Sequence, residues 1–172
     1  MRLTPAATIE DMIAIRRIDA DDWRALRVTR LAALQDAPEA FESTYDGTVG
    51  RTEAQWRDWT EQLATFLAFD GADPVGMAAG YRGDEVPSGS RDLISMWVSP
   101  SLRGRGVAGR LIDSVAGWAR ADGADALHLW IVLGNDSARV AYDRAGFVAT
   151  GDQQPVKGDG HRVEERMVLA LR

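Results

Sequence analysis

The chain has 172 residues, 45% of them hydrophobic and 27% charged, which is typical of a folded globular protein and excludes a disordered one. Its net charge of −6 and pI near 4.9 argue against nucleic-acid binding, which needs a basic surface, so we expect no nucleic-acid partner. Cysteine is absent and no apolar run approaches ~18 residues, which excludes disulfides, thiolate metal sites, a cysteine nucleophile and a membrane-spanning helix.

The first strand and helix are marked by side-chain spacing. The isoleucine-rich segment MIAIRRI predicts a strand over 12–18. A helix is predicted over 19–38, where Asp21 or Asp22 can cap the start and Pro38 stops the end. The apolar positions of this helix are Trp23, Leu26, Leu31 and Leu34.

The next three elements follow from turn and cap signals. Serine, threonine, aspartate and glycine predict a loop over 41–50. Thr52 and Gln55 have the spacing of a capping box, which predicts a second helix over 52–64. Two apolar runs around Gly-Ala-Asp-Pro predict a hairpin over 65–81.

The C-terminal half alternates strands and helices. In chain order it predicts a polar loop over 83–91, a strand over 92–98 ended by Pro100, a helix over 104–122, a strand over 126–134, a short helix capped by Asn135 or Asp136 and ended by Gly146, and last strands at 147–151 and 164–171. This order predicts an α/β (α+β) fold, with helices on the faces of a mixed sheet, in a single domain over 1–172.

Residues 103–109, RGRGVAG, place three glycines and two arginines between a strand and a helix. A helix N-terminus presents unpaired N–H groups and about half a positive charge, and glycine lets a phosphate approach that backbone closely. The spacing G-x-G-x-x-G also matches the dinucleotide fingerprint. However, too little chain follows residue 104 for a dinucleotide fold, and no acidic residue ends the next strand.

The segment RGRGVA, residues 103–108, has the form R-x-x-G-x-A and resembles motif A of the GNAT superfamily of N-acetyltransferases. A second segment resembles the family's N-x-x-A-x-x-x-Y-x-x-x-GF pattern at Asn135, Ala138, Tyr142, Gly146 and Phe147. The resemblance is close over about 92–151, the implied acetyl-CoA-binding core. It implies a mixed, mostly antiparallel twisted sheet of about six to seven strands with about four helices, splayed at the strand before the loop.

The resemblance also implies a reaction and its site. Acetyl-CoA is the implied co-substrate, with no metal, and a primary amine attacks the thioester directly. The implied cofactor-binding residues are Trp97, Val98, Arg103, Gly104, Arg105, Gly106, Val107, Ala108 and Asn135. Among them, a backbone N–H at Trp97 or Val98 is the implied oxyanion donor at a strand bulge, and Asn135 either bonds the pantetheine or only caps its helix. Tyr142 is the implied catalytic residue, donating to the leaving thiolate, unless it is simply a core tyrosine.

The general base stays open, because the strand LISMWV lacks the glutamate that many relatives use, and Asp92 at its start is expected to lie too far from the thioester. The remaining candidates are Glu164, Glu165, Asp46, Glu42, His161 and a water chain. The loop residues Phe41 and Tyr45 are expected either to wall the acceptor cleft or to be ordinary surface and core residues. His128, inside an apolar strand, is expected to be a core residue rather than a metal ligand.

Three functions fit the sequence. The favoured one is acetylation of the primary amine of a small molecule; acetylation of a protein N-terminus or lysine, and non-catalytic acyl-CoA binding, are the alternatives. The acidic charge either favours a cationic acceptor or serves solubility. We expect a cytoplasmic protein without a membrane partner, since MRLTPAATIEDM lacks the apolar segment of a secretory signal. The family resemblance implies a monomer or homodimer.

Overall fold

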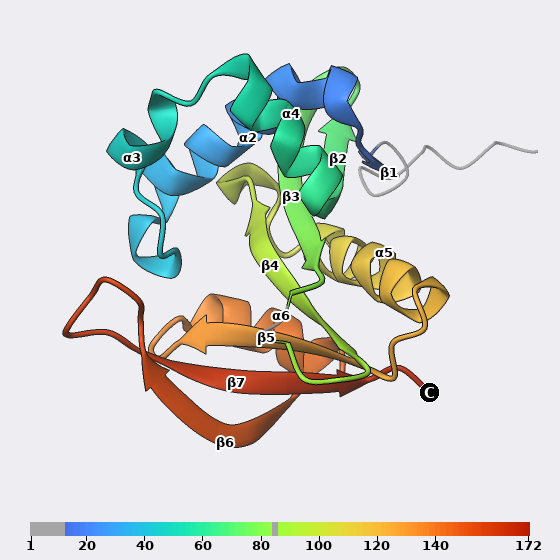
Figure 1. Ribbon diagram of the computed structural model, residues 1–172, viewed down its shortest axis with the longest axis vertical. Coiled ribbons are helices and arrows are strands. Elements are labelled where there is room, and N and C mark those ends of the chain that lie inside the picture. Colours follow the sequence, from blue (N-terminus) through green and yellow to red (C-terminus); the bar gives the residue numbers. More distant parts are fainter. Residues whose placement is uncertain (1–12, 84–85) are drawn as a thin grey trace, which may run out of the picture.

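In the computed structural model, residues 13–83 and 86–172 are described, and their seven strands join one mixed sheet in the order β1-β2-β3-β4-β5-β7-β6 (Figure 1). The strands are β1 (Ile13–Arg17), β2 (Ala64–Asp70), β3 (Asp73–Tyr81), β4 (Ser90–Val98), β5 (Ala126–Val132), β6 (Val148–Pro155) and β7 (Val163–Ala170). Neighbouring strands are antiparallel except β4 and β5, which are parallel. The mixed, mostly antiparallel sheet is therefore confirmed.

Five α-helices lie in the described part of the chain, and they cover both faces of the sheet. They are α2 (Trp23–Asp36), α3 (Tyr45–Val49), α4 (Glu53–Gln62), α5 (Val107–Ala121) and α6 (Asp136–Arg144). The helices α5 and α6 pack on one face in a core that includes Leu111 and Leu127. The helices α2 and α4 pack on the other, in a core that includes Leu26 and Trp56. The molecule thus has two apolar layers separated by the sheet.

Small residues on β3 set how closely α5 approaches the sheet. Gly76, Ala78 and Gly80 alternate along the strand on the α5 face. A Cβ at Gly80 would lie 2.2 Å from a ring carbon of Trp118 on α5, so any side chain there would push the helix away. The close packing of α5 matters for function because the loop in front of this helix carries the glycine motif.

The N-terminal region departs from the sequence prediction at two places. The segment 41–50 is not all loop, because α3 forms within it and Thr44 caps that helix by accepting from the N–H of Gly47 at 3.2 Å. The predicted helix over 19–38 opens with a 3-10 turn whose side-chain cap is Asp19, and Asp22 makes no side-chain cap bond to α2. Asp22 therefore occupies the N-cap position of α2, as one of the two alternatives predicted, but the side-chain cap comes from Asp19 because the 3-10 turn precedes α2.

The remaining elements agree with prediction apart from their ends. The capping box is confirmed, with the hydroxyl of Thr52 accepting from the N–H of Gln55 at 3.3 Å. β4 starts at Ser90, inside the predicted loop over 83–91, because Ser90 and Arg91 pair with Ala126 and Leu127 of β5, and β6 runs on to Pro155. Two parts of those predictions, Met12 and residues 84–85, lie outside the described residues. None of the described helices is long and apolar enough to cross a membrane.

The sheet splits between its two parallel strands. β4 pairs with β5 only over Ser90–Asp92 and Ala126–His128, whereas β5 continues to pair with β7 along its whole length. Beyond this short contact the two strands diverge, as Figure 1 shows. The splay expected at the strand before the R-x-x-G-x-A loop is therefore confirmed, and it leaves a gap bounded by the backbone edges of β4 and β5.

Candidate active site

The wall of the gap formed by β4 carries a β-bulge. Met77 pairs with Trp97 and Ala79 pairs with Ile94, so two residues of β4, Ser95 and Met96, lie opposite the single residue between them on β3. Ser95 has a φ of +56°, the left-handed region that non-glycine residues rarely adopt. A bulge re-aims the strand and its backbone groups. The bulge lies directly before Trp97 and Val98, where the resemblance implied it, because the register between β3 and β4 shifts at Ser95 and Met96.

The strand alternation decides which backbone N–H faces the gap. The N–H of Ser99 donates to the carbonyl of Val75 at 2.8 Å, and Val98 lies opposite Gly76. In an antiparallel pair, alternate residues turn their N–H groups to opposite sides, so the N–H of Val98 points away from β3 and toward the gap. The same alternation turns the N–H of Trp97 toward β3. Of the two predicted oxyanion donors, Val98 has the fitting direction.

The glycine loop lies between β4 and α5. Gly104 has a φ of +73° and Gly106, the N-cap of α5, has a φ of +76°, so both positions use a conformation that favours glycine. Arg105 is exposed, Val107 is buried in the core under the loop, and the half-buried Ala108 packs against that core. The first N–H groups of α5 therefore point out of the helix at a surface with almost no side chains. This arrangement fits an anionic group such as a diphosphate.

Arg103 ties this loop to the rest of the molecule. Its Nε donates to the carbonyl of Val98 at 3.0 Å, and its guanidinium forms an ion pair with Asp36 at the end of α2. The indole of Trp97 donates to the same Asp36 carboxylate at 2.9 Å. These contacts, the Trp97 bond first and the Arg103 bond next, hold the pKa of Asp36 below its usual value. The side chain of Arg103 thus positions the loop against α2.

The helix α6 carries the other two predicted residues. Asn135 caps this helix, its side-chain oxygen accepting from the N–H of Ala138 at 3.3 Å, which leaves its amide NH₂ as a donor. Tyr142 is 8% exposed and packs edge-on against Phe147, with ring centroids 5.7 Å apart. Burial raises the pKa of the Tyr142 phenol. Both residues lie on the α5–α6 side of the sheet.

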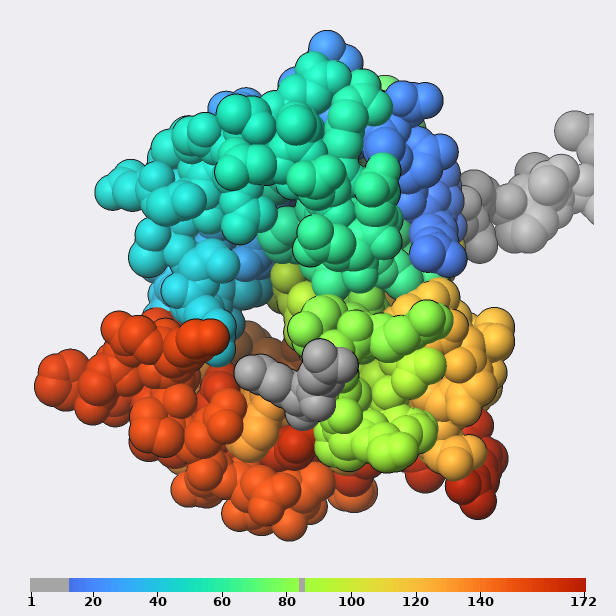
Figure 2. Space-filling view, in the orientation of Figure 1, coloured from blue at the N-terminus to red at the C-terminus, as the bar shows by residue number. Residues whose placement is uncertain are grey.

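A cavity of about 990 Å³ lies on the opposite side, beside α2 and α4. Figure 2 shows it as a hollow between the α2–α4 region and the β6–β7 hairpin. Its floor is β4 from Asp92 to Ser95, and its walls come from α2, α4, β5 and β7. Charged and aromatic side chains that line it include Arg30, Phe41, Glu42, Arg51, Asp58, Trp59, Trp130, Glu164 and Arg166. Phe41 thus lies in the wall of this cavity, which is one of the two positions expected for it from the sequence.

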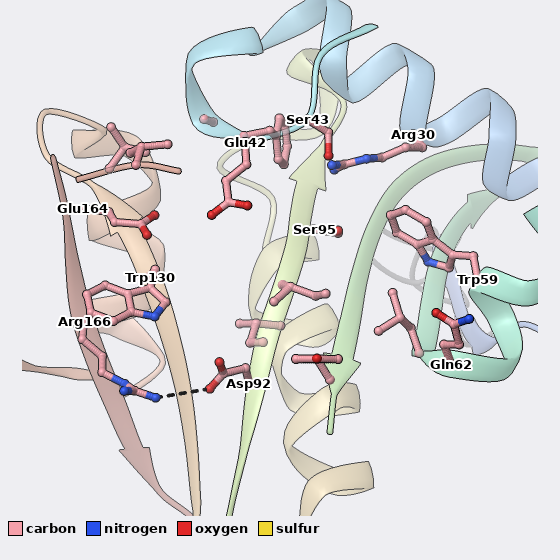
Figure 3. Close-up of a pocket in the computed structure, with 18 of the residues that line it drawn as sticks. Arg30, Glu42, Ser43, Trp59, Gln62, Asp92, Ser95, Trp130, Glu164 and Arg166 are labelled. Carbon is pink, nitrogen blue, oxygen red and sulfur yellow. Dashed lines mark ion pairs between the residues drawn. The ribbon is translucent and has the colours of Figure 1, made fainter. Parts of the chain in front are cut away.

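Two of the candidate bases, Glu42 and Glu164, lie in this cavity, and Figure 3 shows them directed into it. Glu164 is only 6% exposed and accepts from the amide of Gln154 at 2.7 Å. Burial, chiefly, and the charge of Glu42 raise the pKa of the Glu164 carboxyl, whereas Gln154 lowers it. A carboxylate with a raised pKa is a stronger base than one in water.

Asp92 and Arg166 form a second charged pair at the base of the cavity. Their closest atoms are 3.7 Å apart, an ion pair too long to be a hydrogen bond (Figure 3). Burial raises the pKa of Asp92 despite this partner. Arg166 also stacks over Trp130 at 5.3 Å and donates from Nε to Nδ1 of His128 at 3.1 Å. The hydrogen bond from Arg166 accounts for the polar side chain of His128 within β5. No group of side chains that could hold a metal ion occurs among the described residues.

The other candidate bases lie outside the cavity lining. Glu165 alternates to the far face of β7 and forms an ion pair with Arg139 on α6. Asp46 is exposed in the first turn of α3, and His161 is exposed between β6 and β7. Tyr45 also lies outside the lining. Their absence from the cavity lining therefore argues against Glu165, Asp46 and His161 as bases.

Sequence reasoning missed several residues of the cavity. Ser95 carried no signal, because serine is not the residue expected at a positive φ. Arg30 carried a weak one: it lies four residues after Leu26 and four before Leu34, which places a charge on the apolar side of its helix. The aromatic residues Trp59 and Trp130 come from elements far apart in the chain, and no local spacing connects them.

Comparisons with known proteins agree with this architecture. The model of the acetyltransferase (GNAT) family matches residues 23–147. Mycothiol acetyltransferase from Gordonia bronchialis is 31% identical over 147 residues, covering 83% of this chain and 46% of the relative. The corresponding protein from Clavibacter michiganensis is 28% identical over 129 residues, covering 75% of this chain and 39% of the relative. The chain thus spans less than half the length of these curated relatives.

Solved structures share the fold at low sequence identity. An acetyltransferase from Salmonella typhimurium, solved with its cofactor acetyl-CoA, has a TM-score of 0.76 at 19% identity, covering 93% of this chain and 94% of that one. A GNAT acetyltransferase from Streptococcus pneumoniae also has a TM-score of 0.76 at 19% identity, covering 92% of this chain and 98% of that one. Because the family model matches most of the chain, this protein belongs to the GNAT family of acetyltransferases.

Proposed function

We propose that this chain is an acetyl-CoA-dependent N-acetyltransferase that acetylates the primary amine of a small molecule. The observation that carries the proposal is the gap between β4 and β5, which has the glycine loop at the end of one edge and a carboxylate-lined cavity beside it. The two sides suit the two substrates, an anionic donor on the α5 side and an amine on the α2 side. A cavity of about 990 Å³ is in the range that holds a small molecule.

The glycine loop suits the diphosphate of acetyl-CoA. The N–H groups from Gly104 to Ala108 would hold its oxygens, since neither Gly104 nor Gly106 has a Cβ to block the approach. The exposed Arg105 adds positive charge beside them. The amide NH₂ of Asn135 would donate to a pantetheine carbonyl, since its side-chain oxygen already accepts the cap bond. Once bound, acetyl-CoA supplies a thioester carbon that an amine can attack.

Two groups on the protein would stabilise the charges that develop during transfer. The N–H of Val98, turned toward the gap, would donate to the carbonyl oxygen as negative charge forms there. Tyr142 would donate a hydrogen bond to the sulfur as the C–S bond breaks. Ordinary pKa values of about 10 for a phenol and 8.5 for a thiol make full proton transfer uphill by roughly 2 kcal/mol, and burial of Tyr142 increases this gap. Tyr142 therefore acts by hydrogen bonding rather than by giving up its proton.

Glu164 would act as the general base. It accepts one proton from the acceptor ammonium and passes it to solvent; the neutral nitrogen then forms the N–C bond while the C–S bond breaks. The second proton leaves the nitrogen and neutralises the thiolate, so the products are an N-acetyl amine, free thiol and one released proton. The buried position of Glu164 and the nearby charge of Glu42 support this role, because both raise the pKa of its carboxyl.

Release of free thiol from acetyl-CoA with a panel of small primary amines tests the proposal. We expect Glu164→Gln to lower kcat by about 100-fold or more, the contribution typical of general-base catalysis. Glu165→Gln is the matched control, since Glu165 lies on the opposite face of the same strand. Thiol release with no small amine, together with acetylation of intact proteins, would favour the protein substrate instead. Acetyl-CoA binding without any turnover would favour a non-catalytic module.

A further inference from the structure

The cavity contains a buried arginine without a hydrogen-bond partner. Arg30, on α2, is 4% exposed and lines the cavity, and its Nε and Nη1 atoms are buried with no partner among the described residues. A buried charge is costly unless a counter-ion and hydrogen bonds satisfy it. Burial, with the positive charge of Arg51 second, lowers the pKa of Arg30 to about 10. The neighbouring charge is thus a second cation rather than a carboxylate.

Aromatic rings hold the two cations in place. The guanidinium of Arg30 lies 4.5 Å from the ring centroid of Phe41 and 5.6 Å from that of Trp59. Arg51 lies 5.4 Å from Trp59 and 5.6 Å from Trp56. Ring faces attract cations but do not neutralise them or accept their directional N–H bonds fully. This end of the cavity therefore remains positively charged.

The opposite end of the cavity is negative. Figure 3 shows Glu42 and Glu164 to the left of Ser95 and the guanidinium end of Arg30 above Ser95. The further ion pair of the lining, Asp92 with Arg166, spans 3.7 Å and leaves Oδ1 of Asp92 buried without a hydrogen-bond partner among the described residues, so Asp92 adds a third carboxylate to the lining. Asp58, on α4, is exposed. The carboxylates of Glu42 and Glu164 and the guanidinium groups of Arg30 and Arg51 thus line the same cavity as Ser95.

We propose that the acceptor carries a carboxylate as well as the amine, and that Arg30, assisted by Arg51, binds this carboxylate. A guanidinium forms a charge-assisted hydrogen bond with a carboxylate, and the carboxylate also supplies the counter-charge that Arg30 lacks. Glu42 and Glu164, in the same lining, receive the ammonium beside the gap. The substrate class is therefore amino acids and related amino-carboxylates. The inference rests on the proposed acetyltransferase function and adds the chemistry of its acceptor.

Matched acceptors test the inference on the unmodified protein. The panel comprises an amino acid, its carboxamide and the corresponding amine without the carboxyl group, for a set of side chains, with thiol release as the readout. We expect kcat/KM for the amino acid to exceed that for the carboxamide by on the order of 10- to 100-fold, the value of hydrogen bonds between charged groups. Equal rates for carboxamides and amino acids, across the set of side chains, would overturn the inference.

Variants locate the preference at Arg30. In Arg30→Met, which keeps the length of the side chain, we expect the amino acid to carboxamide ratio to fall to within about threefold of unity, mainly through a higher KM. Arg30→Lys should restore part of the ratio, because lysine restores the positive charge but not the planar guanidinium group. Arg27→Met is the matched control: it is on the same helix and outside the cavity lining, and its ratio should stay at the wild-type value. An unchanged ratio in Arg30→Met would refute the assignment.

Two further readouts keep the outcome clear. The amino acid that is acetylated should raise the unfolding temperature of the wild type but not that of Arg30→Met, independently of turnover. If Arg30→Met does not fold, Arg51→Met provides the same comparison from the half-buried partner. If thiol is released only with amines that lack a carboxylate, this inference fails and the proposed function stands. Binding of acetyl-CoA without acetylation of any amine would remove the proposed function.

Discussion

The two glycine substitutions Gly104→Ala and Gly109→Ala should change stability in opposite directions. A Cβ at either position would meet nothing within 4 Å, so steric clashes are absent and only backbone conformation differs. Gly104 has a φ of +73°, and the left-handed region costs a non-glycine residue about 1–2 kcal/mol. Gly109 lies in the first turn of α5 with ordinary helical geometry, where alanine is favoured over glycine by about 0.5–1 kcal/mol.

Allowing for the smaller entropy of the unfolded alanine chain, Gly104→Ala should lower the free energy of unfolding by about 1 kcal/mol. In a chain of this length that corresponds to about 2–4 °C in Tm, and Gly109→Ala should raise Tm by a similar or smaller amount. Urea unfolding and thermal unfolding measure both. Equal stability of the two variants would refute the left-handed loop. A positive φ at Gly104 is what gives the proposed diphosphate-binding loop its shape.

Three further predictions concern the cavity and α6. The kcat/KM of the wild type should fall as pH drops through the raised pKa of Glu164, above the ordinary 4.5, and Glu164→Gln should lack this limb. Tyr142→Phe should lower kcat by about 100-fold or more while changing stability by less than about 1 kcal/mol. Arg30→Met should leave the free energy of unfolding unchanged or raise it by up to about 2 kcal/mol, because it removes a buried, unpaired charge at the expense of two ring contacts.

Each of these predictions has an outcome that contradicts it. A pH profile identical in wild type and Glu164→Gln would mean that a group other than Glu164 accepts the proton of the acceptor ammonium. The stability profile gives a second check: ionisation of a carboxyl with a raised pKa costs folding energy, so the wild type, unlike Glu164→Gln, should lose stability as pH rises through that pKa. Full activity in Tyr142→Phe would make Tyr142 a core residue only. A loss of more than about 2 kcal/mol in Arg30→Met would make Arg30 a structural residue.

The features that could be predicted from the sequence depend on neighbours within a few positions. The capping box at Thr52 and Gln55 and the hairpin over 65–81 both formed as expected. The glycine loop was also predictable, because the left-handed φ at positions 104 and 106 favours glycine. The splay of β4 from β5 was implied by the family resemblance, since no spacing within either strand encodes it.

The acceptor side could not be predicted in the same way. The bulge at Ser95 arises from the register between β3 and β4, a tertiary property with no local marker. The charges of the cavity come from α2, the segment before α3, the start and middle of the α4 region, β4 and β7, so the sequence offered Glu164, Glu165, Asp46, Glu42, His161 and a water chain without a way to choose among them. Only strand alternation in the folded sheet separates Glu164, which enters the cavity, from Glu165, which pairs with Arg139.

Binding of acetyl-CoA at the glycine loop is tested most directly by thermal unfolding over an acetyl-CoA titration, with NADH and ATP as parallel ligands, on the wild type and Gly106→Trp. A ligand at 100 times its Kd stabilises the folded state by about 2.7 kcal/mol, on the order of 5–10 °C for a chain of this size. We predict this rise with acetyl-CoA for the wild type and its loss in folded Gly106→Trp. No rise with acetyl-CoA, or a larger rise with NADH, would contradict a coenzyme A site at this loop.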